Sequence, residues 1–278
     1  MTGMKIQNVS NLIARCWNSA EAALRESIEA KFPDKDEEFI TELFQGELGS
    51  ILDAASSKGE VAHAFQMDLE DAFPGAMHSD LSRISYGLIA TVNFHSKSVE
   101  KKTGGDFGLV FIRPDVSHAW FDGSDLMIDA DYQRGLLCQA KVLRRDAKWG
   151  DLTQSQKKVL SNRLGHLGLV LYQYVDGSDR RKLSKFHWQL TAGVSIEAVS
   201  EWLKTGEFPN LQRSFEIIIS LAQDRIGTDD KEIIAELIAP PTRPSLEIRV
   251  HWRDGDGPGP TVRTHVATHG GQHVRVQI

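Results

Sequence analysis

The sequence predicts an α/β protein in which a mixed β-sheet is flanked by helices. Three observations support this prediction. Helix-like segments fill the beginning of the chain, several short apolar segments with strand composition follow them, and a strand–helix–strand passage comes later. Consecutive strands joined by short polar links favour an antiparallel start to the sheet, and the later passage favours one parallel crossover.

Helical patterns occupy residues 10–31, 34–57 and 59–73. The first segment is rich in Ala, Leu, Glu and Arg and ends before Pro33, and the third ends before Pro74. The second segment begins with crowded acidic residues, which stabilise a helix N-terminus. Its apolar residues form two adjacent stripes at helical spacing, so we expect one side of this helix to be buried.

Strand patterns follow in the middle of the chain, where Val, Ile, Leu and Phe are frequent. We expect strands over residues 87–94, 106–112, 136–142, 167–175 and 184–193. A polar link, residues 95–105, separates the first two strands. A short excursion with a turn at Asp122-Gly123 precedes the third strand, and a polar helix within 153–166 precedes the fourth. Helices over 195–204 and 211–226, and strands over 245–252, 261–269 and 273–278, complete the expected elements.

The bulk composition is that of an ordinary globular protein. The chain has 278 residues, of which 41% are hydrophobic and 25% charged, so we expect one or two domains. Cys16 and Cys138 are too few for a disulfide framework, which favours a reducing, cytoplasmic setting. Polar residues interrupt the N-terminus too early for a signal peptide, and no apolar run has the length of a membrane span. We therefore expect no membrane partner.

Charge is distributed unevenly along the chain. The net charge of −6 by itself argues against a nucleic-acid-binding protein, and residues 21–80 carry 15 acids against 4 bases. Residues 141–185, in contrast, carry 11 bases against 4 acids, a net charge of +7. Such a basic block attracts polyanions even in an acidic chain, unless it is only a solvated helix face and a surface turn. The expected nucleic-acid contacts are Arg144, Arg145, Lys148, Arg180, Arg181 and Lys182.

The third expected strand contains an amide and an ammonium in an otherwise apolar sequence. Gln139 and Lys141 are two residues apart, so they project from one face of the strand, while Cys138, Ala140 and Val142 project from the other. Burial of a lysine is costly unless the ammonium is paired or takes part in chemistry. The alternatives are that Gln139 bonds to a neighbouring strand and that Lys141 extends to water at a sheet edge.

Two acidic residues are candidates to join Gln139 and Lys141. Asp106 opens the preceding strand directly after two glycines, which permit close approach of a ligand, although a simple turn residue is the alternative. Glu47 lies on the stripe of Phe39, Leu43 and Ile51 in the second helix, where a core-side acid needs a neutralising partner. A narrower apolar face would make Glu47 a surface acid. Carboxylate and amide oxygens together suit Mg²⁺.

The chain resembles the PD-(D/E)xK nuclease superfamily in three features. These are an acid on a helix, Asp after Gly at the head of one strand, and Gln-x-Lys on the next strand. The Gln-x-Lys form resembles the branch of Mrr-like restriction endonucleases. The resemblance covers residues 42–175. It implies a restriction-endonuclease-like core over 36–190, with an N-terminal helical segment over 1–35 and a C-terminal α+β extension over 191–278. The site residues that it implies are Asp106, Gln139 and Glu47 (alternatively Glu42) as metal ligands and catalytic groups, Lys141 as a catalytic residue, and Gln154 and Gln156 as weaker candidates.

The resemblance implies a Mg²⁺- or Mn²⁺-dependent endonuclease that hydrolyses DNA phosphodiester bonds, in the setting of restriction or antiviral defence. A partner protein of the same system or a second copy of the chain is the expected protein partner. The chain departs from the family pattern at Gly105, where Pro is usual, and at Gln139, where an acid is usual. The second departure removes a charge from the metal site. It supports the alternative of a catalytically inactive nuclease-fold subunit that binds or regulates within a larger complex.

Overall fold

The structure is a computed structural model of the chain. It describes residues 6–31, 37–72, 84–91, 97–114, 120–122, 125–127, 131–143, 149–176, 181–238 and 246–254. The helices are α1 (Gln7–Lys31), α2 (Glu37–Ser57), α3 (Glu60–Ala72), α5 (Lys97–Thr103), α6 (Gln154–Leu160), α7 (Ile196–Thr205), α8 (Ser214–Ala222) and α9 (Lys231–Ile238). The strands are β1 (Ile84–Thr91), β2 (Phe107–Pro114), β3 (Trp120–Asp122), β4 (Asp125–Met127), β5 (Asp131–Val142), β6 (Leu167–Asp176), β7 (Arg181–Leu190) and β8 (Leu246–Asp254).

Six of these strands form one mixed sheet in the order β1-β8-β2-β5-β6-β7. Strands β2 and β5 are antiparallel neighbours, as are β6 and β7, whereas β5 and β6 are parallel and are joined through α6. The expected parallel crossover is therefore confirmed. The short strands β3 and β4 form a separate hairpin, which confirms the excursion expected around Asp122.

The position of β8 differs from the expected antiparallel start. The first two strands in the chain, β1 and β2, are not neighbours, because β8 lies between them, antiparallel to β1 and parallel to β2. The segment predicted as a C-terminal extension thus supplies an inner strand of the sheet. The strands expected over 261–269 and 273–278 lie outside the described residues.

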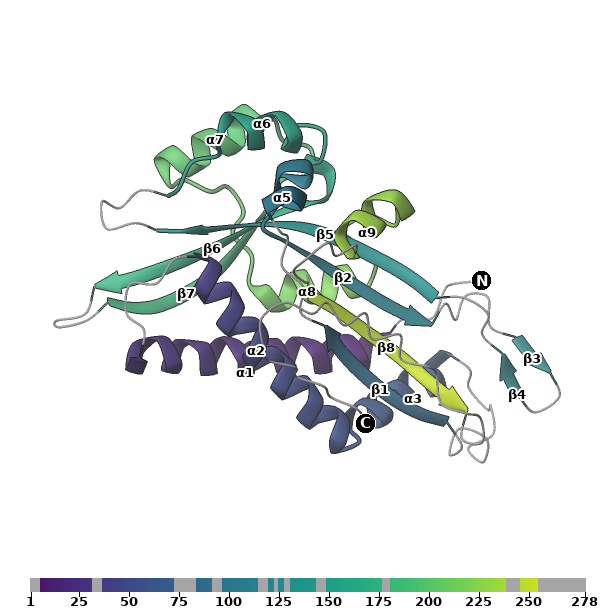
Figure 1. Cartoon of the computed structure of the whole chain (residues 1–278). Coiled ribbons are helices and arrows are strands. Elements are labelled where there is room, and N and C mark those ends of the chain that lie inside the picture. The colour runs from purple at the N-terminus through teal and green to yellow at the C-terminus, as the bar shows by residue number, and fades with distance from the viewer. Residues whose placement is uncertain are drawn as a thin grey trace.

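Helices cover both faces of the sheet and enclose two hydrophobic cores. Figure 1 shows α5, α6, α7 and α9 on one side of the sheet and α1, α2 and α3 on the other. Strand β5 contributes to both cores because its side chains alternate between the two faces: Leu136, Cys138 and Ala140 pack in the core with α1, α2 and α8, and Leu137 packs in the core with α6, α7 and α9. A strand buried on both faces has the nearly continuous apolar sequence seen in β5.

The N-terminal helices are close to their expected ranges, with α1 starting three residues earlier. Helix α5 was not expected, because its seven residues are mostly polar and show no apolar periodicity; it lies within the segment predicted as a link. The polar helix expected within 153–166 ends at Leu160 and continues after a turn as a 3-10 helix over Leu164–His166. Gln45 of α2 is buried. Among the described residues no helix is both long and apolar enough to span a bilayer.

Candidate active site

Asp106 stands between α5 and β2, at the end of a sharply constrained turn. Helix α5 ends at Thr103, and Gly104 follows with a φ of +75°, its N–H donating to the Glu100 carbonyl over 2.7 Å. Gly105 is pressed against β5, since a Cβ atom built there would lie 2.4 Å from Leu137 Cδ1. The crowding explains why glycine occupies this position.

Asp106 is fixed to β5 by three polar contacts, one of its backbone and two of its carboxylate. Its backbone N–H donates to the Cys138 carbonyl over 2.8 Å, which extends the β2–β5 ladder by one residue. Asp106 Oδ2 accepts a hydrogen bond from the Ala140 N–H over 2.7 Å and another from Gln139 Nε2. The structure therefore brings Asp106 and Gln139 together, as the sequence predicted.

Gln139 and Lys141 lie side by side on one buried face of the sheet. Their side chains are only 1% and 5% exposed, and their neighbours in register on β6 are Leu169 and Leu171. Both leucines belong to the core with α6, so the expected common face is confirmed. Within the part of the chain that the structure describes, the Lys141 ammonium makes no hydrogen bond or ion pair. An ammonium in this environment strongly favours a nearby anion.

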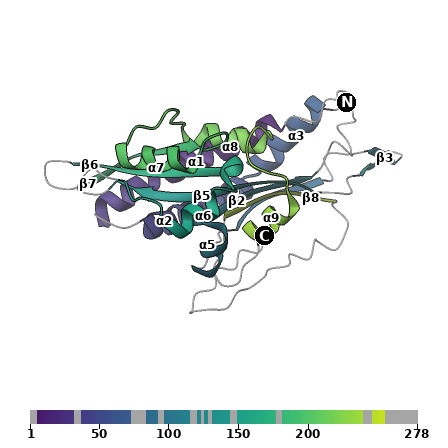
Figure 2. The same cartoon turned by 90° about the horizontal axis from the view of Figure 1, so that it is seen from above.

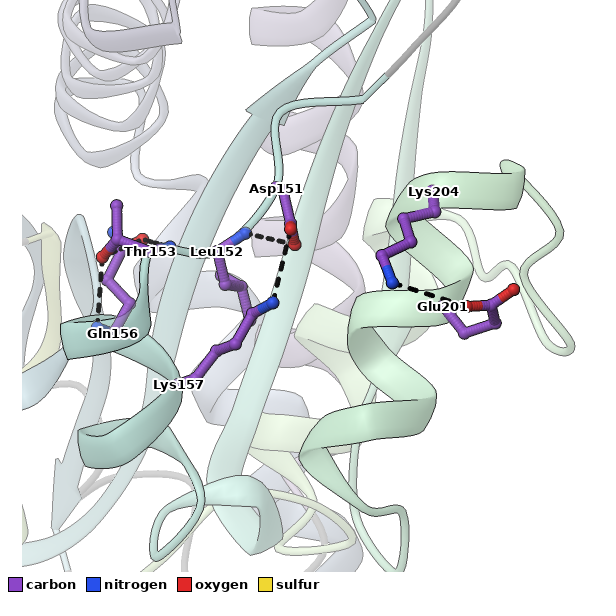
Figure 3. Close-up of polar contacts among 7 residues, drawn as sticks. All are labelled: Asp151, Leu152, Thr153, Gln156, Lys157, Glu201 and Lys204. Carbon is purple, nitrogen blue, oxygen red and sulfur yellow. Dashed lines mark hydrogen bonds and ion pairs between the residues drawn. The ribbon is translucent and has the colours of Figure 1, made fainter.

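Helices α5 and α6 pack together above this face and add two polar groups. Gln156 Nε2 donates to Gln139 Oε1 over 3.5 Å and to Glu100 Oε1 over 3.3 Å. The other end of the Gln156 amide fixes its orientation. Gln156 Oε1 accepts a hydrogen bond from the Thr153 N–H over 2.9 Å, in a capping box at the start of α6. Figure 3 shows Thr153 and Gln156 facing each other there, and the turned view in Figure 2 shows α5 and α6 as neighbours.

Gln156 was a weaker candidate from sequence, and its contact with Gln139 strengthens it. The spacing Thr153-x-x-Gln156 is a capping-box pattern and was the available signal. Gln154, the other weaker candidate, is exposed on α6 and has no recorded contact with Gln139 among the described residues.

The structure does not bring Glu47 to the other candidates. Helix α2 packs through Ile40, Phe44 and Leu48 in the core that also contains Cys138 and Ala140, which is the face of β5 opposite to Gln139 and Lys141. Glu47 is partly buried at the flank of this helix, and Glu42 is exposed. No recorded contact in the described ranges joins either glutamate to Asp106, Gln139 or Lys141.

The predicted nucleic-acid contacts fall largely outside the described residues. Arg144, Arg145, Lys148 and Arg180 lie there entirely, and for Arg181 and Lys182 the structure describes only the backbone, in β7. Other basic residues lie near the site. Lys101 and Lys102 are exposed on α5, and Lys158 is exposed on α6, whereas Lys157 pairs with Asp151 over 3.3 Å (Figure 3).

On the opposite face of β5 the titratable groups are held neutral. Burial, and secondly the negative charge of Asp106, raises the pKa of the Cys138 thiol well above its usual range. Burial also raises the pKa of the Tyr172 hydroxyl, which forms a 2.7 Å hydrogen bond with Thr41 Oγ1 of α2. These groups serve packing, so acid–base or electrostatic chemistry at this strand belongs to the face with Gln139 and Lys141.

The arrangement fits a hard divalent cation better than a soft one. The oxygens on this side of β5 are those of the Asp106 carboxylate, of the Gln139 amide and of the Glu100 carboxylate, which Gln156 links to Gln139; all are ligand types that Mg²⁺ accepts. Within the described ranges no group of three or more His, Cys, Asp or Glu side chains is placed to hold a metal. A cation here would therefore use amide or water oxygens besides the two carboxylates.

Comparison of the chain with family models, with curated proteins and with solved structures found no match. Membership of the PD-(D/E)xK superfamily therefore stays a prediction, which rests on the motif residues and their placement on β2 and β5.

Proposed function

We propose that the protein is a Mg²⁺-dependent nuclease that hydrolyses DNA phosphodiester bonds. The observation that carries this proposal is the pairing of Asp106 with Gln139 at the head of β2, with Lys141 buried two residues further on the same face of β5. A carboxylate, an amide oxygen and an ammonium on one strand pair are groups suited to act on a phosphate. A restriction or host-defence effector is the setting we propose for this activity.

The buried Lys141 supports an anionic substrate. A lysine that is 5% exposed among leucines is costly in isolation, and a phosphate bound beside it would supply the compensating charge. During hydrolysis the ammonium would stabilise the negative charge that develops on the phosphoryl oxygens. A bound Mg²⁺ would polarise a phosphoryl oxygen and lower the pKa of a bound water. Asp106 would hold its position through the Ala140 N–H while it contributes oxygen ligands.

Exposed lysines beside the site support a polyanionic substrate. Lys101, Lys102 and Lys158 lie on the two helices that carry Glu100 and Gln156. A nucleic-acid backbone that reached Asp106 from this side would meet these cations, which would make binding sensitive to salt. The net charge of +7 over residues 141–185 acts in the same direction.

The proposal is tested by cleavage of supercoiled plasmid with Mg²⁺ or Mn²⁺. Lys141→Met keeps the length and apolar stem of the side chain but removes the charge, so we expect the cleavage rate to fall about 100-fold or more. The matched control is Lys204→Met on α7, where the lysine is exposed and contacts only Glu201 over 3.8 Å among the recorded ion pairs (Figure 3). This control should cleave like the wild type. Equal cleavage by both variants, or an inert wild type on DNA and RNA alike, contradicts the proposal.

A second candidate function is a catalytically inactive nuclease-fold subunit that binds or regulates. The hydrogen bonds of Asp106 favour this candidate. Asp106 Oδ2 already accepts from two donors of β5, the Ala140 N–H and Gln139 Nε2, which gives the carboxylate a structural role. In this case the wild type binds DNA or a partner protein without cleavage, and a fully folded Lys141→Met variant binds equally well. Charge reversal at Arg180, Arg181 and Lys182 would then abolish binding.

A further inference from the structure

Helix α5 brings a second carboxylate to the candidate site. Glu100 lies six residues before Asp106, on the helix that ends directly at the Gly104-Gly105 turn. This turn allows little adjustment: a Cβ at Gly104 would lie 2.7 Å from Leu160 of α6, and a Cβ at Gly105 would lie 2.4 Å from Leu137 of β5. The short connection and its close packing therefore fix α5, and with it Glu100, relative to Asp106.

Gln156 shows how close Glu100 lies to the amide of Gln139. A single nitrogen, Gln156 Nε2, is 3.3 Å from Glu100 Oε1 and 3.5 Å from Gln139 Oε1. The capping box holds the other end of the Gln156 amide on Thr153, so the nitrogen is the end that faces the two oxygens. The Glu100 carboxylate and the Gln139 carbonyl thus converge on one donor, while the Gln139 nitrogen bonds to Asp106.

We propose that Glu100, and not Glu47, provides the second carboxylate of a divalent-cation site whose other protein ligands are Asp106 and the Gln139 amide oxygen. The inference rests on the proposed function only in assuming that the site uses a metal. Glu100 Oε1 and Gln139 Oε1 both face the NH2 group of Gln156, and a cation in its place would meet two oxygen ligands. Lys141, which is 5% exposed on the same strand face, would pair with an anion bound at the cation, such as a phosphate, and not with the cation itself.

The position of the two glutamates distinguishes Glu100 from Glu47. Glu100 is linked to Gln139 through one side chain, whereas Glu47 belongs to a helix that packs on the other face of β5. A carboxylate on α5 also compensates for the charge lost at position 139, where the family pattern has an acid. The site would then hold two carboxylates and one amide, a set sufficient for Mg²⁺ with several bound waters.

The test is a titration of the purified full chain with Mn²⁺, followed by electron paramagnetic resonance of the free ion. Glu100→Gln should raise the Kd for Mn²⁺ by at least about tenfold. Loss of a group that hydrogen-bonds to a metal ligand typically weakens metal binding about 10- to 100-fold, and loss of a ligand itself should weaken it at least as much. Glu47→Gln is the matched control and should bind like the wild type. Glu100→Asp keeps the charge and should recover part of the affinity, and circular dichroism confirms that each variant is folded.

The inference is overturned if Glu100→Gln binds Mn²⁺ like the wild type, if Glu47→Gln is the variant that loses affinity, or if the wild type binds no Mn²⁺ at millimolar concentration. Plasmid cleavage separates this result from the fate of the proposed nuclease. A Glu100-dependent Mn²⁺ site without any cleavage supports the metal site and contradicts the nuclease. Cleavage that needs Glu47 but not Glu100 supports the nuclease and contradicts the inference.

Discussion

At the scale of single residues, the site depends on how closely the backbone of one strand approaches the next. Asp106 is bonded to β5 through its N–H and its carboxylate, and the glycine before it is packed directly on Leu137. From sequence, two-residue alternation predicts only the common face of Gln139 and Lys141. The pairing of Asp106 with Gln139, 33 positions apart, could be predicted only through the motif, which places the two residues on consecutive strands. The contact with Gln156 could be suggested only weakly, since it depends on how far α6 reaches over the sheet.

Gly105→Ala is expected to damage the site through packing alone. The new methyl group would lie 2.4 Å from Leu137 Cδ1 and 3.0 Å from the Cys138 carbonyl oxygen, so either the buried Leu137 side chain or the backbone before Asp106 must shift. We expect the free energy of unfolding to fall by about 1–3 kcal/mol, measured by urea denaturation. Gly165→Ala is the control, because nothing lies within 4 Å of its added Cβ. An unchanged midpoint for Gly105→Ala would show that the turn adapts freely.

At the scale of secondary-structure elements, polar side chains fix the helices whose apolar patterns were read correctly from the sequence. The start of α1 is capped from α3, since the Asp68 carboxylate accepts hydrogen bonds from the N–H groups of Asn8 and Val9 over 2.7 and 3.0 Å. Helix periodicity predicted both helices but not this contact, because Asn8 and Asp68 are 60 positions apart in the sequence. Helix α5 was missed for a related reason: its stability comes from packing on α6 and from the Gly104 turn, not from an apolar stripe.

Asp68→Ala should destabilise the protein through loss of this cap. Asp68 is fully buried, and its removal leaves two backbone donors and the Asn8 amide without their acceptor. We expect a loss of about 1–3 kcal/mol in the free energy of unfolding, followed by chemical denaturation with far-ultraviolet circular dichroism. Asp71→Ala, on the exposed side of α3, should change it by less than about 0.5 kcal/mol. Equal effects of the two variants would argue against the cap.

At the scale of the whole molecule, contacts distant in the sequence join the N-terminal helices to the sheet. Glu21 of α1 accepts hydrogen bonds from Trp17 Nε1 over 3.1 Å and from Ser214 Oγ of α8, and Ser214 in turn accepts the Trp188 Nε1–H of β7 over 2.9 Å. The α/β class and the crossover were predictable from local patterns. The pairing of β8 with β1 and β2 was not, because strand composition shows that a segment is a strand without indicating its neighbours.

The acid in this network makes stability depend on pH. Burial raises the pKa of Glu21 above its ordinary value of 4.5, against the opposing effects of Ser214, Trp17 and Arg25. The folded state therefore retains the proton more strongly than the unfolded state, and the corresponding stability, complete below pH 4.5, is lost as the pH rises through the raised pKa.

Glu21→Gln removes this titration but keeps a hydrogen-bond acceptor for Trp17 and Ser214. The melting temperature of this variant relative to the wild type should therefore increase between pH 4 and pH 7, when both are followed by thermal denaturation. A difference that stays constant over this range would show that the folded and unfolded states hold the Glu21 proton equally.

The inner position of β8 has a consequence for the time at which the sheet around Asp106 is completed. During synthesis, the residues of β2, β5 and the helices with Glu100 and Gln156 leave the ribosome well before residues 246–254. Until then β2 has only one of its two neighbouring strands, and β1 has no place in the sheet beside β2. Strand β2, which Asp106 directly precedes, thus gains its second hydrogen-bonded neighbour late. A growing chain therefore contains the candidate site residues before the sheet that supports them is complete.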